Sequence, residues 1–252
     1  MYNLSIIFIR NQNNIMPKQP RDHLCVALDN ISDKTQLSAL VNEIKEYVGV
    51  YKIGLEQFVR FGPPILDIIR EVNGKIFLDL KLHDIPNTVA KAVTAACSHT
   101  IDYLTIHTSG GKAMLEAAAE AAEKAPNPPK LLGVTVLTSI DEKTLRHDLG
   151  VERNLPEQVV HLTKLAVDAN MDGIVCSAVD LPHVTPHTPE HFELVTPGIR
   201  LPDEGAGDQK RVATPDEAVK AGATLLVVGR GLVQAQNKHR FLKRIFAILY
   251  NK

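Results

Sequence analysis

Asp79 and Lys81 stand near the end of the apolar segment IFLDLKLHDIPNTV (76–89), where their spacing suggests chemistry. Residues two apart on a β-strand share one face, so both charges point to the same side and the neighbouring Leu78, Leu80 and Leu82 to the other. Two opposite charges buried inside a protein are costly unless they pair. A lysine ammonium held there supplies fixed positive charge and a transferable proton, which suits catalysis at a developing anion.

Three further charges follow nearby strand ends. Asp29 ends the segment VALD, Lys52 lies in VGVYKIG, and Asp84 follows Lys81 by three residues. One Asp-x-Lys pair at a strand end is often only an ion pair, and Asp29 or Lys52 alone would favour a structural role. The convergence of four or more charges on neighbouring strand ends favours a functional site.

Short β-branched segments alternate with longer helical ones from residue 23 onward. The spacing predicts strands at 23–28, 50–53, 75–80, 103–106, 131–136, 173–176, 193–196 and 225–228. It predicts helices near 34–48, 56–72, 87–98, 112–124, 156–169, 179–185, 215–221 and 232–249. Ser32 and Thr214 are the predicted helix caps, and Pro215 follows Thr214 at the first helical position.

Eight strand–helix units predict a (β/α)₈ TIM barrel in a single domain, residues 21–252, with an open doubly wound sheet as the alternative. Barrel enzymes carry their chemistry at the carboxyl ends of the strands, which is where the charges lie. Residues 1–20 are interpreted as an N-terminal extension outside the fold, with Met16 as a second candidate start.

Composition narrows the possible partners. The chain of 252 residues is 44% hydrophobic and 23% charged, with a formal charge of −1 and a pI near 6.8. We therefore expect neither nucleic acid nor a membrane surface as a partner. The leading LSIIFI is too short to span a bilayer. Three cysteines without metal-ligand spacing indicate a reducing, cytoplasmic location.

A phosphate site is expected where the last two strands end, as is common in TIM barrels. The eighth strand runs into VVGRG, in which Gly229 allows close approach of backbone amides to an anion and Arg230 offers a forked contact. The segment 199–215 is interpreted as a lid hinged around Gly205 and Gly207.

The ten histidines prompt a metal hypothesis, which the sequence disfavours. His183, His187 and His191 are spaced by four, but the intervening prolines break any helix that would align them. His83 and His107 are interpreted as structural.

The segment DLKLHDIPNTV resembles the signature of the orotidine 5′-phosphate decarboxylase family. The resemblance extends from residue 23 to about 235 through VALD, YKIG, HTSGG, VLTS, TPGIR and VVGRG. It implies decarboxylation of orotidine 5′-monophosphate to uridine 5′-monophosphate without a cofactor or metal. It also implies a homodimer with shared active sites.

The resemblance also implies residue roles. Lys81 would protonate C6 of the pyrimidine, Asp79 would lie against the substrate carboxylate, Lys52 would link Asp79 to the ribose, and Asp29 would accept hydrogen bonds from the ribose hydroxyls. Other implied roles concern Asp84 and Thr88 in the neighbouring subunit's site, Gln209 and Arg200 at the phosphate, and Thr138 at the base, with Ser139 as its competitor.

Two alternatives remain at this point. One is a metal-dependent sugar-phosphate decarboxylase or aldolase built on the same barrel with a related Asp-x-Lys-x-x-Asp motif. The other is a catalytically silent phosphate-binding barrel. The full LKLHDIPNT context argues against the first, and the intact set of lysines and aspartates argues against the second.

Overall fold

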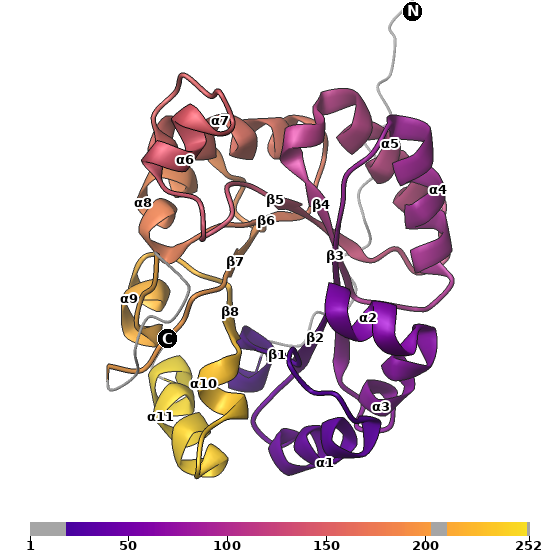
Figure 1. Ribbon diagram of the computed structural model, residues 1–252, viewed down its shortest axis with the longest axis vertical. Coiled ribbons are helices and arrows are strands. Elements are labelled where there is room, and N and C mark those ends of the chain that lie inside the picture. The colour runs from indigo at the N-terminus through magenta and orange to yellow at the C-terminus, as the bar shows by residue number, and fades with distance from the viewer. Residues whose placement is uncertain (1–18, 203–210, 251–252) are drawn as a thin grey trace, which may run out of the picture.

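Eight parallel strands form a closed barrel in the computed structural model, which describes residues 19–202 and 211–250 (Figure 1). Each strand pairs with the next along the chain, and β8 pairs with β1 to close the sheet. The predicted (β/α)₈ fold is confirmed. The strands are β1 (Leu24–Ala27), β2 (Val50–Gly54), β3 (Lys75–Leu82), β4 (Tyr103–His107), β5 (Lys130–Val134), β6 (Gly173–Val175), β7 (Glu193–Thr196) and β8 (Leu225–Val228).

The helices surround the barrel (Figure 1). They are α1 (Lys34–Ile44), α2 (Leu55–Phe61), α3 (Asp67–Arg70), α4 (Pro86–Cys97), α5 (Lys112–Glu123), α6 (Glu142–His147), α7 (Leu155–Asp168), α8 (Leu181–Val184), α9 (Pro215–Lys220), α10 (Arg230–Val233) and α11 (Lys238–Tyr250). Short 3₁₀ turns occupy Pro20–His23, Pro63–Leu66, Thr108–Gly110, Ala178–Asp180 and Thr185–His187. No helix of the described ranges has the length and apolar character needed to cross a membrane.

Two layers of buried side chains stabilise this arrangement. Phe77, Val195 and Val227 belong to the cluster that fills the barrel interior, whereas Leu78 and Leu104 belong to the larger cluster between the strands and the helices. This division follows the strand alternation, since neighbouring residues face opposite sides of the sheet.

Of the two predicted helix caps, Thr214 is confirmed and Ser32 is wrong. The Thr214 hydroxyl accepts a hydrogen bond from the Glu217 backbone N–H, and Pro215 opens α9, as predicted. At α1 the cap is Asp33, not Ser32, because the Asp33 carboxylate accepts from the Thr35 N–H at 2.8 Å.

Several predicted helices are divided. The predicted helix 56–72 is interrupted at Gly62, where φ is +65° and a Pro-Pro pair begins the next turn. The predicted helices 179–185 and 232–249 are also split, the second into α10 and α11. Helix α6 was not predicted, although Asp141 caps it by accepting from the Thr144 N–H.

Candidate active site

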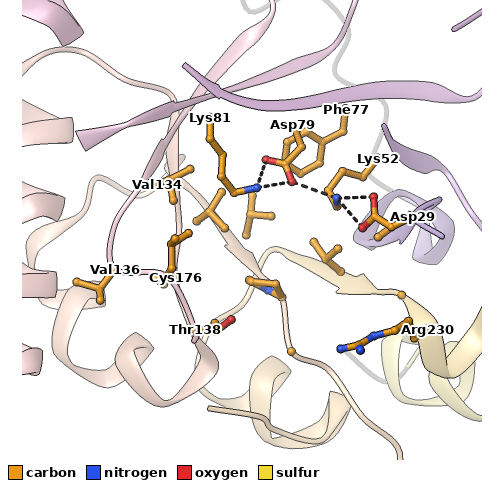
Figure 2. A pocket seen from close by; sticks show the side chains of 18 of the residues that line it. Asp29, Lys52, Phe77, Asp79, Lys81, Val134, Val136, Thr138, Cys176 and Arg230 are labelled. Atoms are coloured by element: carbon orange, nitrogen blue, oxygen red, sulfur yellow. Dashed lines mark hydrogen bonds and ion pairs between the residues drawn. The ribbon is translucent and has the colours of Figure 1, made fainter. Parts of the chain in front are cut away.

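A cavity of about 400 Å³ opens at the carboxyl ends of the strands, on the side where the sequence places its charges (Figure 2). Every strand except β4 contributes to its wall directly or through the loop that follows. The lining includes most of the predicted site residues: Asp29, Lys52, Asp79, Lys81, Thr138, Arg200, Gly229 and Arg230. The sequence therefore located the cavity and much of its polar surface.

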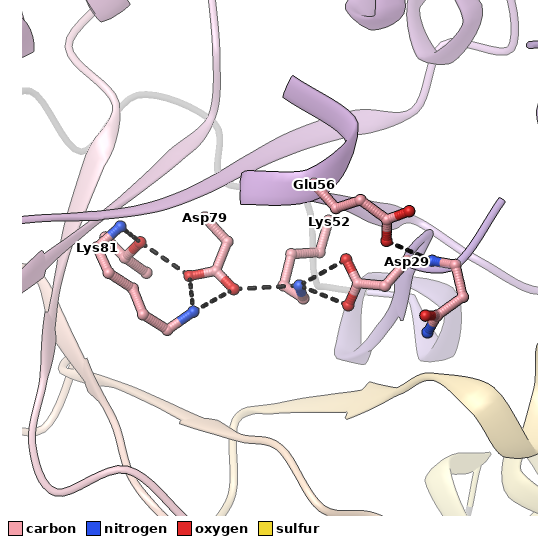
Figure 3. A network of polar contacts seen from close by, with 7 residues as sticks. Asp29, Lys52, Glu56, Asp79 and Lys81 are labelled. Carbon is pink, nitrogen blue, oxygen red and sulfur yellow. Dashed lines mark hydrogen bonds and ion pairs between the residues drawn. The ribbon is translucent and has the colours of Figure 1, made fainter. Parts of the chain in front are cut away.

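Asp29, Lys52, Asp79 and Lys81 form a continuous row of alternating charge, which we call the charged row (Figure 3). Lys52 Nζ lies 3.2 Å from Asp29 Oδ2 and 3.1 Å from Asp79 Oδ2. Lys81 Nζ donates to both Asp79 oxygens at 2.8 Å. Asp79 thus lies between two ammonium groups, and the pairing offsets the cost of burying these charges.

Lys52 and Asp79, the two inner residues of the charged row, stay charged although burial disfavours a charge at both. Burial alone would raise the pKa of Asp79, but the ammonium groups of Lys52 and Lys81 hold that pKa below its ordinary value. Burial alone would lower the pKa of Lys52, yet the carboxylates of Asp79 and Asp29 raise it above its ordinary value. Both residues are therefore charged at neutral pH.

The backbone that brings the Lys81 and Asp79 side chains together is not that of a regular β-strand. Lys81 has φ +49°, in the left-handed region, and the β3–β4 register shifts between Leu78 and Leu82. The Lys81 N–H donates to Thr105 Oγ1, a buried residue of β4 that sequence reasoning missed. A threonine in a strand is an ordinary β-former and gave no signal.

Asp29 is fitted closely against β2. A Cβ added to Gly54 would lie 2.7 Å from Asp29 Oδ1, so glycine at position 54 leaves the space that the carboxylate occupies. The next residue, Asn30, has φ +61°, and its N–H donates to Glu56 Oε2 at 3.1 Å (Figure 3). Gly54 and Glu56 were not predicted as part of the site.

The opposite wall of the cavity is apolar. It is formed mainly by β5, β6 and β7 and the residues just after them: Val134, Val136, Val175, Cys176, Val195 and Pro197. Figure 2 shows the charged row along one side, with Val134, Val136 and Cys176 apart from it. An apolar wall excludes water and strengthens the field of the charges it faces.

The expected phosphate end lies at the loops after β7 and β8. Gly229, Arg230 and Arg200 line the cavity there, and Arg200 Nη1 donates to the Ile199 carbonyl at 3.0 Å. Thr138 lines the cavity, whereas its neighbour Ser139 is exposed. The helix after Gly229 is α10, which has only four residues, so its dipole contributes less than a long helix would. Gln209, Gly205 and Gly207 lie outside the described residues.

Arg211 anchors the carboxyl side of the predicted lid segment and was not predicted. Its guanidinium pairs with Asp180 at 2.6 Å and donates to the carbonyls of Val136 and Leu137. Burial raises the pKa of Asp180 despite the arginine beside it. This buried ion pair ties the loops after β5, β6 and β7 together beside Thr138.

Asp84 and Thr88 do not join the charged row of their own chain. Both are exposed, neither lines the cavity, and Asp84 Oδ1 accepts a hydrogen bond from the Ile85 N–H at 2.7 Å. Within one chain, the charged row therefore runs from Asp29 to Lys81, and Asp84, which the sequence grouped with these charges, lies outside it.

His83 and His107 pack with ring centroids 5.6 Å apart beside the Lys81 end of the row. Burial, followed by the nearby His83 and Lys81, lowers the pKa of His107 below its ordinary value. Among the described residues, no group of three or more histidine, cysteine, aspartate or glutamate side chains is arranged to hold a metal ion.

Comparisons with known proteins agree with this geometry. The orotidine 5′-phosphate decarboxylase / HUMPS family matches residues 22–245. The orotidine 5′-phosphate decarboxylase of Moorella thermoacetica is 42% identical over 220 residues, 85% of this chain and 87% of that protein. The protein of the same name from Nostoc sp. is 42% identical over 229 residues, 89% and 95% of the two chains. The crystal structure of orotidine 5′-phosphate decarboxylase from Lactobacillus acidophilus superposes with a TM-score of 0.78 at 32% identity, covering 90% of this chain and 98% of that one.

Proposed function

The chain belongs to the orotidine 5′-phosphate decarboxylase / HUMPS family, and from this premise we propose which residues carry its reaction. It is a lyase of pyrimidine biosynthesis that converts orotidine 5′-monophosphate to uridine 5′-monophosphate. The metal-dependent sugar-phosphate alternative is not favoured by these relatives. The observation that carries the residue-level proposal is the position of the Lys81 ammonium, 2.8 Å from Asp79 on the wall of the cavity.

Lys81 acts as the proton donor. When the bond between C6 and the carboxylate breaks, CO₂ leaves and the electron pair remains on C6, where no ring carbonyl is placed to delocalise it. The Lys81 ammonium stabilises this developing charge and then transfers a proton to C6, which leaves a neutral amine. No cofactor takes part in this sequence of steps.

Asp79 acts on the substrate before the bond breaks. Its carboxylate is held ionised between two ammonium groups, so a substrate carboxylate placed beside it meets like-charge repulsion. The repulsion disappears as neutral CO₂ forms, which lowers the barrier relative to the bound substrate. The apolar wall opposite supplies a place for CO₂ that requires no hydrogen bonds.

The remaining lining residues bind the rest of the nucleotide. Asp29 accepts from the ribose hydroxyls, and Lys52 joins Asp29 to Asp79. Arg230, the Gly229 backbone and Arg200 bind the phosphate at the opposite end, and Gln209, which lies outside the described residues, is a further phosphate ligand. Thr138 contacts the pyrimidine, a role supported by its position on the cavity wall.

Asp84 and Thr88 serve the active site of a second copy of the chain. Their exposure and their absence from their own cavity support this role. Ile85 between them is 66% exposed, and Val59 on α2 is 81% exposed, so apolar surface is available for an isologous dimer. A cytoplasmic homodimer with shared sites is therefore the form we propose.

The first experiment tests the proton donor. Enzyme treated with EDTA is mixed with orotidine 5′-monophosphate, and pyrimidine absorbance and CO₂ release are followed for the native chain and for Lys81→Ala. We expect EDTA-resistant activity in the native chain and a loss of kcat beyond the factor of about 10²–10⁴ typical of a general acid. A Lys81→Ala protein with a tenth of native kcat would refute the assignment.

The second experiment tests the shared site. Lys81→Ala and Asp84→Ala proteins, each nearly inactive, are mixed under conditions of demonstrated subunit exchange. A mixed dimer then has one site with both defects and one with neither. About half of the dimers are mixed at random assortment, so recovery approaches about a quarter of native activity. No recovery would mean that each chain supplies its own Asp84.

A further inference from the structure

Thr105 lies in the middle of β4, fully buried, and its hydroxyl contacts the charged row from behind. The Lys81 N–H donates to Thr105 Oγ1 at 2.9 Å, and the Thr105 hydroxyl donates to Asp79 Oδ1 at 2.9 Å. We propose that Thr105 is a positioning residue for decarboxylation, which fixes the Lys81 ammonium relative to the Asp79 carboxylate. This inference rests on the function proposed above and extends it.

The direction of both hydrogen bonds follows from the groups involved. A backbone N–H can only donate, so the Thr105 oxygen must accept from Lys81. An ionised carboxylate can only accept, so the single hydroxyl proton of Thr105 must point to Asp79. The hydroxyl therefore has one consistent orientation, and it joins the backbone of one reactive residue to the side chain of the other.

The local backbone explains why such a link is needed. Leu78 pairs with Leu104 and Leu82 with Ile106, so β3 spans four residues where β4 spans two. Lys81 lies within this irregular stretch, in a left-handed conformation that lysine seldom adopts. The register shifts across this stretch, and the Lys81 N–H donates to a side-chain oxygen of the neighbouring strand, Thr105 Oγ1.

Loss of the hydroxyl would leave two buried polar partners with one bond fewer each. The Lys81 backbone could then shift toward a regular register, and a register change in a strand redirects side chains. The ammonium would move relative to Asp79 while both residues remained present. Among the described residues, Thr105 does not line the cavity, so nucleotide binding by Asp29 and Arg230 is expected to persist.

The test compares three variants with matched chemistry. Thr105→Val removes the hydroxyl with little change of shape, and Thr105→Ser keeps it. Thr163→Val is the control, because Thr163 is also fully buried and its hydroxyl donates to the Val159 carbonyl at 2.8 Å, on α7.

Steady-state kinetics with orotidine 5′-monophosphate separates positioning from general destabilisation. We expect Thr105→Val to lose about 10- to 100-fold in kcat, the effect of a small misplacement of reacting groups. Its KM, and both constants of Thr105→Ser and Thr163→Val, should stay within about threefold of native. If Thr105→Val does not fold, Thr105→Ala takes its place, because it also lacks the hydroxyl.

A binding measurement gives an independent readout. Uridine 5′-monophosphate, neutral at C6, should bind native and hydroxyl-less protein equally. The 6-hydroxy analogue, which carries an oxyanion at C6, should bind the hydroxyl-less variant about 10- to 100-fold more weakly. Native kcat in Thr105→Val, or equal losses in Thr105→Ser and Thr105→Val, would overturn the inference. Absence of turnover in the native chain and in Thr163→Val would instead refute the proposed function.

Discussion

Replacing Lys52 by methionine removes the central ammonium of the charged row while keeping a side chain of similar length. The Lys52 side chain is 12% exposed, and it contacts Asp79, which is 8% exposed, and Asp29, which is 39% exposed. The substitution therefore leaves one deeply buried carboxylate and one half-exposed carboxylate without this cation.

The stability lost in Lys52→Met depends on which partners the Asp79 carboxylate keeps. Removing one partner of a buried ion pair costs about 3–5 kcal/mol when the other charge is left alone. Asp79 keeps Lys81 at 2.8 Å and the Thr105 hydroxyl at 2.9 Å. We therefore expect Lys52→Met to lower the free energy of unfolding by about 2–3 kcal/mol, which lowers Tm by about 4–12 °C in a chain of this size.

Asp29→Asn is the matched control. It removes the outer pair of the row, and a pair with a half-exposed carboxylate contributes less than about 1 kcal/mol. Urea unfolding of both variants beside the native chain gives the two differences directly. If Lys52→Met were no less stable than Asp29→Asn, the pairing of Lys52 with Asp79 would not be the dominant interaction of the row.

The pH dependence of the stability lost in Lys52→Met follows from the directions in which the pKa values of Lys52 and Asp79 are shifted. The raised pKa of Lys52 means that its stabilising contribution is complete below the ordinary value of 10.5 and is lost only as pH rises through the raised value. The lowered pKa of Asp79 means that its contribution is lost only as pH falls below the ordinary value of 3.8. The loss of stability in Lys52→Met should therefore be constant between about pH 6 and 9.

Three further predictions concern other parts of the chain. Gly54→Ala places a Cβ 2.7 Å from Asp29 Oδ1, so we expect KM for the nucleotide to rise about 10- to 100-fold with little change in Tm; an unchanged KM would contradict the role of Asp29. Because the pKa of His107 is lowered in the folded chain, the unfolded chain takes up the proton first, and stability falls as pH falls from the ordinary value of 6.5 toward the lowered pKa. Urea unfolding at about pH 7.5 and 5.5 should therefore show a smaller fall in the free energy of unfolding for His107→Gln than for the native chain; equal falls would refute this. A chain beginning at Met16 should be soluble, with kcat/KM within about twofold of the full chain, since the family match begins at residue 22; an insoluble or inactive product would make the extension part of the fold.

The barrel was predictable because its strands carry strong local signals. Each of the eight predicted segments overlaps an observed strand, since β-branched segments bounded by turn residues are typical of buried parallel strands. Helix boundaries were less well predicted. Gly62 and the two prolines after it should have ended the predicted helix 56–72, but the apolar spacing on both sides suggested continuity.

The site was predictable where its residues are unusual for their surroundings. Lysine and aspartate at the end of an apolar strand are conspicuous, so the sequence identified all four residues of the charged row, although it also grouped Asp84 with them. Thr105, Gly54 and Arg211 were missed because their roles depend on what lies opposite them in space. Nothing in the sequence near Thr105 indicates that β3 and β4 change register beside it.

The irregular pairing of β3 with β4 has a consequence for transplanting this chemistry into other proteins. Four residues of β3 against two of β4 set where the Lys81 ammonium stands, so the lysine and its carboxylate are not a portable pair of side chains. A designer who copied Asp-x-Lys onto a regular strand of another barrel would reproduce the composition without the geometry. The unit to graft is the bulged strand together with the threonine that holds it, which is a property of two neighbouring backbones.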